Sequence, residues 1–155
     1  MKALITGASS GMGRDMAKIL SQKGYDLILV ARDEKKLEEV KKQLKTETKI
    51  VVMDISNEEN CKKIYEENKD IDILINNAGF GDCGHFEETS LDKDIQMIHT
   101  NIIAYHILTK LYLKEMIKKD SGKILNVASI AGFMPGPLMT TYLSLIHISE
   151  PTRRT

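Results

Sequence analysis

The chain has 155 residues, which is enough for one domain and leaves little room for a second. Its composition, 42% hydrophobic and 28% charged, is that of a globular protein. Lysine plus arginine equals aspartate plus glutamate, and no apolar run approaches the roughly 20 residues of a membrane span, so we expect no nucleic-acid or membrane partner.

The cysteines and histidines form no recognisable framework. Cys61 and Cys83 lie far apart in the chain and fit neither a disulfide framework nor a metal site. The four histidines show no ligand spacing, so we predict no metal. The chain passes from Met1 and Lys2 straight into an apolar run without a signal peptide, and we expect reduced cysteines in a cytoplasmic protein.

Short apolar runs alternate with longer amphipathic stretches in the first third of the chain. Residues 3–5 predict a strand, followed by a glycine-rich turn and a helix through about Lys23, with Gly24 at its C-terminal end. Residues 27–30 predict a second strand. The next helix has apolar residues three and four apart, at Leu37, Val40 and Leu44.

The middle of the chain continues this alternation. Residues 50–53 predict a third strand, and Ser56 with Glu59 predicts a capping box that opens the next helix. Residues 71–75 predict a fourth strand. The residues of the intervening helix that we expect to face inward are Cys61, Ile64 and Tyr65.

A long helix and a fifth strand follow. The helix is predicted from about Leu91 to Lys118, and residues 124–127 predict the strand. The apolar residues expected on one side of the helix are Ile95, Ile98, Ile102, Tyr105, Leu108 and Met116. Strands that are apolar throughout and separated by helices predict a doubly wound parallel sheet, an α/β Rossmann-like fold with about five strands. Ligands of such folds bind at the carboxyl ends of the strands.

The turn after the first strand carries three glycines spaced as G-x-x-x-G-x-G. Glycine lets the backbone approach a pyrophosphate closely, and the N-terminus of the following helix favours an anion. We predict a dinucleotide phosphate site made by Gly7, Ser9, Ser10, Gly11, Met12 and Gly13. An ordinary glycine-rich turn is the alternative interpretation.

This spacing differs from the G-x-G-x-x-G of long-chain dehydrogenases and resembles that of the short-chain dehydrogenase/reductase family. Further marks of the family follow in order from Lys2 to Tyr142 without a gap. They are Asp54 after the third strand, the sequence Asn76-Asn77-Ala78-Gly79 after the fourth, Asn101 in the long helix, Ser129 in a window running to Pro135, and Tyr142 thirteen residues after that serine. The resemblance implies that Asp54, Asn77, Ala78 and Gly79 line the cofactor.

The end of the second strand decides between NADP and NAD. An acid there would bond to the ribose 2′-hydroxyl, whereas an arginine would pair with a 2′-phosphate. Arg32 follows the small Ala31, which resembles the NADP-preferring members. Asp33 is the competing signal, but it is one residue late and is predicted to cap the next helix. We therefore expect NADP as the cofactor, with NAD as the alternative. The alternative interpretation of Arg32 is a solvated residue at the start of the helix, without a role in cofactor choice.

The resemblance also implies a chemistry. In this family a tyrosine exchanges a proton with the substrate oxygen as hydride moves between the nicotinamide and a carbonyl or alcohol carbon. A lysine four residues later favours the phenolate, a serine polarises the substrate oxygen, and an asparagine holds a relay water. By resemblance, the catalytic residues are Asn101, Ser129 and Tyr142. The plain alternatives are a loop-capping Ser129 and a half-buried core Tyr142.

The sequence departs from the family after Tyr142. Ile146 stands where the lysine is expected, and the resemblance is interpreted as stopping at Leu143, with the lysine-bearing helix absent. From Leu143 to Arg153 the residues are the in-frame translation of a transposase-type sequencing adapter. We therefore divide the chain into an incomplete NAD(P)-binding domain, 1–142, and a non-native tail, 143–155. We expect the fifth strand to be an exposed sheet edge.

Three hypotheses about function stay open. The parent protein is an NADP(H)-dependent oxidoreductase acting on a small carbonyl or alcohol and forming homo-oligomers, as implied by the resemblance. Alternatively, the chain is a dinucleotide-binding module without hydride transfer. As a third hypothesis, the 155-residue chain is a truncated and inactive form of the first.

Overall fold

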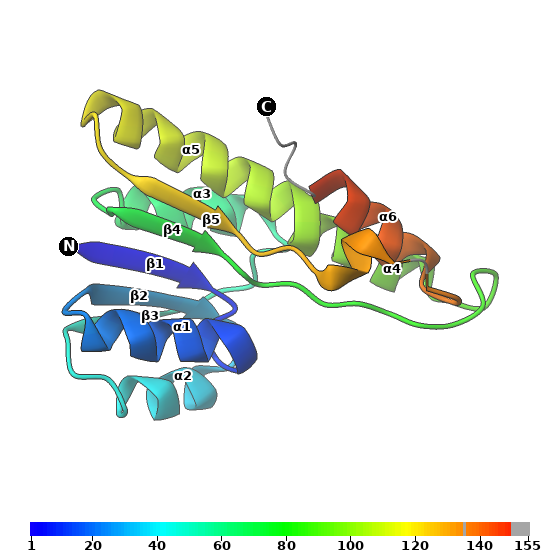
Figure 1. The fold of residues 1–155 in the computed structure, drawn as a ribbon, viewed down its shortest axis with the longest axis horizontal. Coiled ribbons are helices and arrows are strands. Elements are labelled where there is room, and N and C mark those ends of the chain that lie inside the picture. The colour runs from blue at the N-terminus through cyan, green and yellow to red at the C-terminus, as the bar shows by residue number, and fades with distance from the viewer. Residues whose placement is uncertain (135, 150–155) are drawn as a thin grey trace.

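A five-stranded sheet lies between two layers of helices in the computed structural model, which describes residues 1–134 and 136–149 (Figure 1). All neighbouring strands are parallel, in the order β3-β2-β1-β4-β5. The strands are β1 (Lys2–Thr6), β2 (Asp26–Ala31), β3 (Thr48–Val52), β4 (Ile73–Asn76) and β5 (Lys123–Asn126). The predicted doubly wound α/β fold is confirmed.

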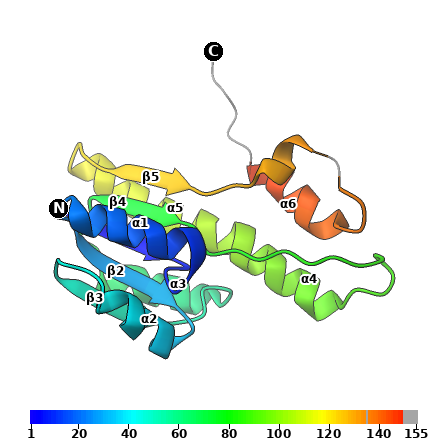
Figure 2. The same cartoon turned by 60° about the horizontal axis from the view of Figure 1, so that its bottom comes forward.

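Helices α1 and α2 cover one face of the sheet, and α3 and α5 cover the other (Figures 1 and 2). The helices are α1 (Gly11–Gln22), α2 (Glu34–Lys41), α3 (Glu58–Glu67), α4 (Leu91–Ile98), α5 (Ala104–Lys118) and α6 (Thr140–Ser149), with a π-helical turn η1 (His99–Ile103) and a 3-10 turn η2 (Ile130–Phe133). No helix in the described part of the chain is long and apolar enough to cross a membrane.

The central strands are apolar throughout because successive side chains enter different layers. In β1, Ala3 and Ile5 pack in the layer of α1 and α2, and Leu4 packs in the layer of α3 and α5. All three are fully buried. Because all neighbouring strands are parallel, their carboxyl ends lie at one edge of the sheet, and α4, α6 and the loop before α4 extend beyond that edge (Figures 1 and 2).

Two predicted helix ends are confirmed and one is wrong. Asp33 caps α2, because its Oδ1 accepts the N–H of Lys36 at 3.0 Å, and Gly24 follows α1 with φ +83°. The capping box at Ser56 is wrong. Asn57, one residue later, caps α3 instead. Its Oδ1 accepts the N–H groups of Glu59 and Asn60, in the first turn of the helix, at 2.9 and 3.3 Å.

The long helix is interrupted by η1, which the sequence did not predict. A π-helical turn inserts extra chain and rotates the face of the helix that follows it. Ile95, expected to face inward, is 46% exposed, whereas Leu108 and Met116 are buried as expected. Six residues between Met97 and Met116 are buried in this segment. They are Met97, Asn101, Ala104, Leu108, Tyr112 and Met116.

The chain after β5 both confirms and corrects the prediction. Strand β5 is an edge of the sheet in the described chain, and Leu125 is 47% exposed, as expected. The expected absence of the next helix is wrong, because α6 forms across residue 143 and buries Leu145 and Ile146. Its apolar residues pack on η2, where a Cβ added to Gly132 would lie 3.2 Å from Ile146 Cγ2. Pro135 and tail residues 150–155 lie outside the described residues.

Candidate functional site

A cleft of about 530 Å³ opens at the carboxyl ends of β1, β2, β3 and β4. This is where a doubly wound sheet binds its ligands. Ten of the eleven predicted cofactor residues line it, namely Gly7, Ser9, Ser10, Gly11, Met12, Arg32, Asp54, Asn77, Ala78 and Gly79. Gly13 does not line the cleft and is buried behind it.

The turn after β1 and the loop after β4 are locked together by hydrogen bonds. Thr6 Oγ1 accepts the N–H groups of Asn77 and Ala78 at 3.0 and 3.1 Å, and Asn77 Nδ2 donates to the Thr6 carbonyl oxygen at 3.0 Å. Asn77 Nδ2 also donates to the carbonyl oxygen of Gly7 at 3.3 Å. The two loops therefore form one rigid wall of the cleft.

Two of the glycines are required because these loops approach each other so closely. A Cβ on Gly7 would lie 2.7 Å from Ala78 Cα, and φ there is +66°. A Cβ on Gly13 would lie 2.3 Å from the Gly7 carbonyl oxygen and 2.6 Å from Asn77 Nδ2. Both positions exclude a side chain, so the glycine spacing fixes the packing that shapes the cleft.

Helix α1 begins at this wall with its first-turn N–H groups free of intrahelical acceptors. Its N-cap residue, Ser10, makes no side-chain capping hydrogen bond. Ser9, Ser10 and Gly11 line the cleft, so hydroxyls and backbone N–H groups together offer donors to an anion. This donor set fits a pyrophosphate.

Charged side chains occupy the part of the cleft at the end of β2. Arg32 Nη1 lies 3.8 Å from Asp54 Oδ2, and both side chains are partly exposed. Asp33 also lines the cleft, and its hydrogen bond from the Lys36 N–H, helped by the Lys36 charge, holds the pKa of that carboxyl below its ordinary value. The capping role predicted for Asp33 thus coexists with a place in the cleft.

A smaller cavity of about 140 Å³ adjoins the cleft and shares Met12, Asn77, Gly79 and Phe80 with it. Asn101 and Tyr142 both line this cavity, so the structure brings two of the three predicted catalytic residues together. The ring of Tyr142 packs on Gly81, where a Cβ would lie 3.2 Å from Tyr142 Cδ2. Tyr105 lies beside them, and its burial, with a smaller effect of Tyr142, raises its pKa.

The third predicted catalytic residue, Ser129, does not line this cavity. Its Oγ accepts the N–H of Ala131 at 3.2 Å and caps η2. Ile146 lines the cavity at the position where the resemblance implies lysine, and none of the described residues lining the cavity is lysine or arginine. Within residues 1–134 and 136–149, this cavity therefore supplies no cation to Tyr142.

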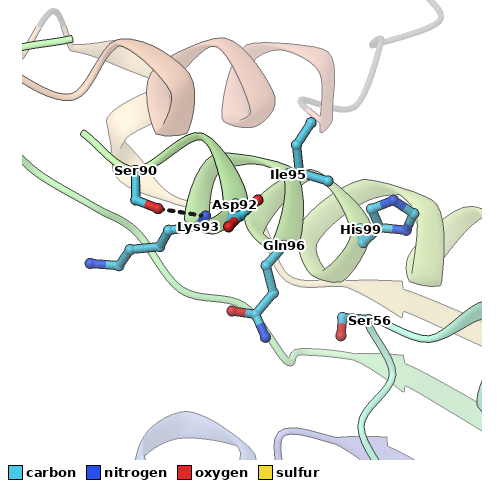
Figure 3. Close-up of a pocket in the computed structure, with 7 residues that line it drawn as sticks. All are labelled: Ser56, Ser90, Asp92, Lys93, Ile95, Gln96 and His99. Carbon is cyan, nitrogen blue, oxygen red and sulfur yellow. Dashed lines mark hydrogen bonds between the residues drawn. The ribbon is translucent and has the colours of Figure 1, made fainter. Parts of the chain in front are cut away.

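A separate hollow lies on the outer side of α4, between that helix and the loop before α3 (Figure 3). Gln96 and His99 lie on the side of Ser56, whereas Ile95 and Lys93 point away from it (Figure 3). Ser90 caps α4 by accepting the Lys93 N–H, and Nδ1 of His99 is buried without a partner in the described chain. No group of three His, Cys, Asp or Glu side chains able to hold a metal lies within residues 1–134 and 136–149.

Sequence reasoning missed several residues of the site. Thr6 directly precedes the first glycine of the motif, but the sequence does not show its hydrogen bonds to the loop after β4. Phe80 and Thr100 adjoin predicted residues and line the cleft. Lys36 also lines it, and nothing in the sequence separates this lysine from its neighbour Lys35.

The fold and the glycine cradle are those of the dinucleotide-binding α/β class of proteins. The family model described as short chain dehydrogenase matches residues 1–144, and the chain belongs to this family. The predicted family is therefore confirmed.

The chain is also similar to individual relatives. An uncharacterized oxidoreductase of Staphylococcus epidermidis is 35% identical over 144 residues, which cover 90% of this chain and 63% of that protein. A very-long-chain 3-oxoacyl-CoA reductase of Phaeosphaeria nodorum is 39% identical, covering 90% of this chain and 45% of its own length. The chain thus spans about half to two thirds of these curated relatives.

Solved structures agree with the fold. The bulky-bulky ketone specific alcohol dehydrogenase of Comamonas testosteroni has a TM-score of 0.87 at 28% identity, covering 94% of this chain and 61% of that one. A short-chain dehydrogenase of Sphingobium yanoikuyae in complex with NADPH has the same TM-score and identity, covering 94% and 60%. Dinucleotide binding is therefore a property of structures similar to this one.

Proposed function

We propose that this chain carries the cofactor-binding half of an oxidoreductase that transfers a hydride between NADP(H) and a carbonyl or alcohol substrate. The observation that carries the proposal is the cleft in which the glycine turn, Arg32 and the loop at Asn77 meet. The glycine turn and the α1 N-terminus would hold the pyrophosphate, and Arg32 would pair with a 2′-phosphate. Asp54 would hold the adenine end.

The residues of the smaller cavity would handle the proton. When bound, NADP(H) supplies or accepts the hydride at the substrate carbon. The hydroxyl of Tyr142 would give a proton to the substrate oxygen in reduction and take one in oxidation. Asn101 would hold the neighbouring loop in place, and Ser129 would polarise the same oxygen if its capping hydrogen bond is exchanged for one to substrate.

A second function, dinucleotide binding without turnover, is favoured by Ile146. A free phenol has a pKa of about 10, so a tyrosine without a neighbouring cation is a poor base near neutral pH. Ile146 is only 7% exposed and supplies no charge. The 155-residue chain would then bind NADP(H) with little or no catalysis, while the whole protein, a homo-oligomer of the cytoplasm in this proposal, would be active.

We also propose that residues 143–155 are not native to the protein. The translated adapter sequence begins at Leu143, close to where the family match ends at residue 144. Sequencing the source DNA across codons 142 and 143 tests this division. Finding a lysine codon at position 146 would support it, and finding the same adapter-like codons in genomic DNA would contradict it.

The function is tested by binding and turnover on the same preparation. NADPH fluorescence on titration with the chain measures binding, and the absorbance change at 340 nm with a panel of aldehydes and ketones measures turnover. Tyr142→Phe should leave NADPH binding unchanged and remove any turnover. Absence of both NADPH and NADH binding would overturn the proposal.

A further inference from the structure

Lys36 is a second basic residue of the cleft, besides Arg32. It lies in the first turn of α2 and lines the cleft together with Arg32 and Asp33. Its Nζ is 3.6 Å from Asp33 Oδ2, while its backbone N–H donates to Asp33 Oδ1 at 3.0 Å. The backbone hydrogen bond holds the Lys36 backbone beside Asp33, and the ammonium group pairs with this carboxylate, which also lines the cleft.

The charges at the end of β2 consist of two ion pairs. Arg32 pairs with Asp54 and Lys36 pairs with Asp33, so each cation faces a carboxylate of the same cleft. An unpaired Asp33 would repel a 2′-phosphate and would be free to accept a hydrogen bond from a 2′-hydroxyl. The Lys36 ammonium opposes both effects.

We propose that Lys36 is a second determinant of the preference for a 2′-phosphorylated dinucleotide, acting beside Arg32. It places a second positive charge at the 2′-phosphate position and neutralises the Asp33 carboxylate there. This inference rests on the proposed function and specifies its cofactor site. The Lys36 side chain is 60% exposed, so it can turn from Asp33 to a phosphate without unpacking the core.

Lys35 provides a matched control. It is the neighbouring residue on the same helical turn, it is exposed, and it does not line the cleft. Lys36→Gln and Lys35→Gln remove the same charge from the chain, so any general effect of net charge is equal in the two variants. A difference between them reports the position of the charge.

The experiment measures binding of NADPH and NADH by fluorescence, and of adenosine 2′,5′-bisphosphate and 5′-AMP by calorimetry, to the full chain and both variants. K36Q should weaken NADPH and the bisphosphate about five- to tenfold more than K35Q does, in the range of one exposed charge-assisted contact, and leave NADH and 5′-AMP unchanged. Equal affinities of K36Q and K35Q would overturn the inference while NADPH binding by the unaltered chain upholds the proposed function.

Asp33→Asn supplies a second measurement. Asparagine is as good an N-cap as aspartate, so α2 keeps its cap while the carboxylate charge is lost. D33N should strengthen binding of the bisphosphate, and it should restore part of the affinity when combined with K36Q. If D33N changes the affinity for the bisphosphate neither in the unaltered chain nor in K36Q, the Lys36–Asp33 pair does not determine cofactor preference at this site.

Discussion

Asn101 and Phe80 are joined by a reciprocal pair of hydrogen bonds. The Phe80 N–H donates to Asn101 Oδ1 at 3.2 Å, and Asn101 Nδ2 donates to the Phe80 carbonyl oxygen at 2.8 Å. The pair connects the π-helical turn η1 to the loop after β4, directly beside the cavity that contains Tyr142. An asparagine amide is suited to this position because it offers a donor and an acceptor together.

Replacing Asn101 by alanine should therefore destabilise the fold. The side chain is 7% exposed, and its loss leaves the Phe80 N–H and carbonyl oxygen without these partners. We expect the free energy of unfolding to fall by about 1–3 kcal/mol, measured by urea denaturation. Ile95→Ala, at a 46% exposed position of α4, is the control and should cost less than about 0.5 kcal/mol. Equal losses of unfolding free energy in N101A and I95A would show that the hydrogen bonds between Asn101 and Phe80 make no specific contribution to stability.

A methyl group at position 13 should disrupt the cleft. In Gly13→Ala the new Cβ would meet the Gly7 carbonyl oxygen and Asn77 Nδ2, and a backbone atom cannot move aside as a flexible side chain can. We expect a loss of about 3 kcal/mol or more, together with loss of NADPH binding.

Gly24→Ala is the control for this clash. Gly24 has φ +83° and open space around it, so an alanine there would cause backbone strain but no steric clash. We expect this strain to lower the free energy of unfolding by about 1–2 kcal/mol. NADPH binding by G24A should be unchanged. A G13A chain that melts and binds like G24A would contradict the role given to the glycine spacing.

The order of the elements could be predicted because its signals are local. Apolar runs such as 27–30 and the glycines at 7, 11 and 13 specify strands and a turn without reference to distant residues. The cap of α3 could not be placed to one residue, because Ser56 and Asn57 are both good capping residues.

Tertiary relationships account for what the sequence did not predict. A π-helical turn interrupts the long helix, and a hydrophobic pattern with a period of 3.6 residues gives no sign of such a turn. Lys36 enters the site only because α2 lies beside the end of β2. Helix α6 was expected to be absent, yet residues such as Leu145 and Ile146 find an apolar surface at η2.

Alkaline pH should destabilise the protein through its buried acids. Burial, with smaller contributions from Glu58 and Asp54, raises the pKa of Cys61 to about 12, from an ordinary value of 9.0. The folded state therefore retains a proton that the unfolded state loses, and stability present below pH 9 falls as the pH rises toward 12. Burial also raises the pKa values of Tyr105 and Tyr112, which act in the same direction.

Thermal unfolding followed by circular dichroism at pH 8 and pH 10.5 measures this loss. Cys61→Ala should lose stability at neutral pH but show a smaller decrease between the two pH values than the unaltered chain. The exposed residue Cys83 is the matched control, and Cys83→Ala should leave the decrease unchanged. A decrease that C61A and C83A share in full would exclude Cys61 as a source.

Placing a lysine at position 146 should give the chain activity. Ile146 lies four residues after Tyr142 on α6 and lines the same cavity, so an Ile146→Lys ammonium would lie beside the phenol and favour its ionised form. We expect the rate of NADPH oxidation with a carbonyl substrate to rise at least about 100-fold, the lower end of what a positioned acid or base contributes. I146K should also unfold more easily, because position 146 is 7% exposed.

Ile148→Lys, at a 70% exposed position of the same helix, adds the same charge without placing it in the Tyr142 cavity, and its rate of NADPH oxidation should not change. If I146K and I148K turn over substrate equally slowly while both bind NADPH, a missing cation is not what limits the activity of this chain.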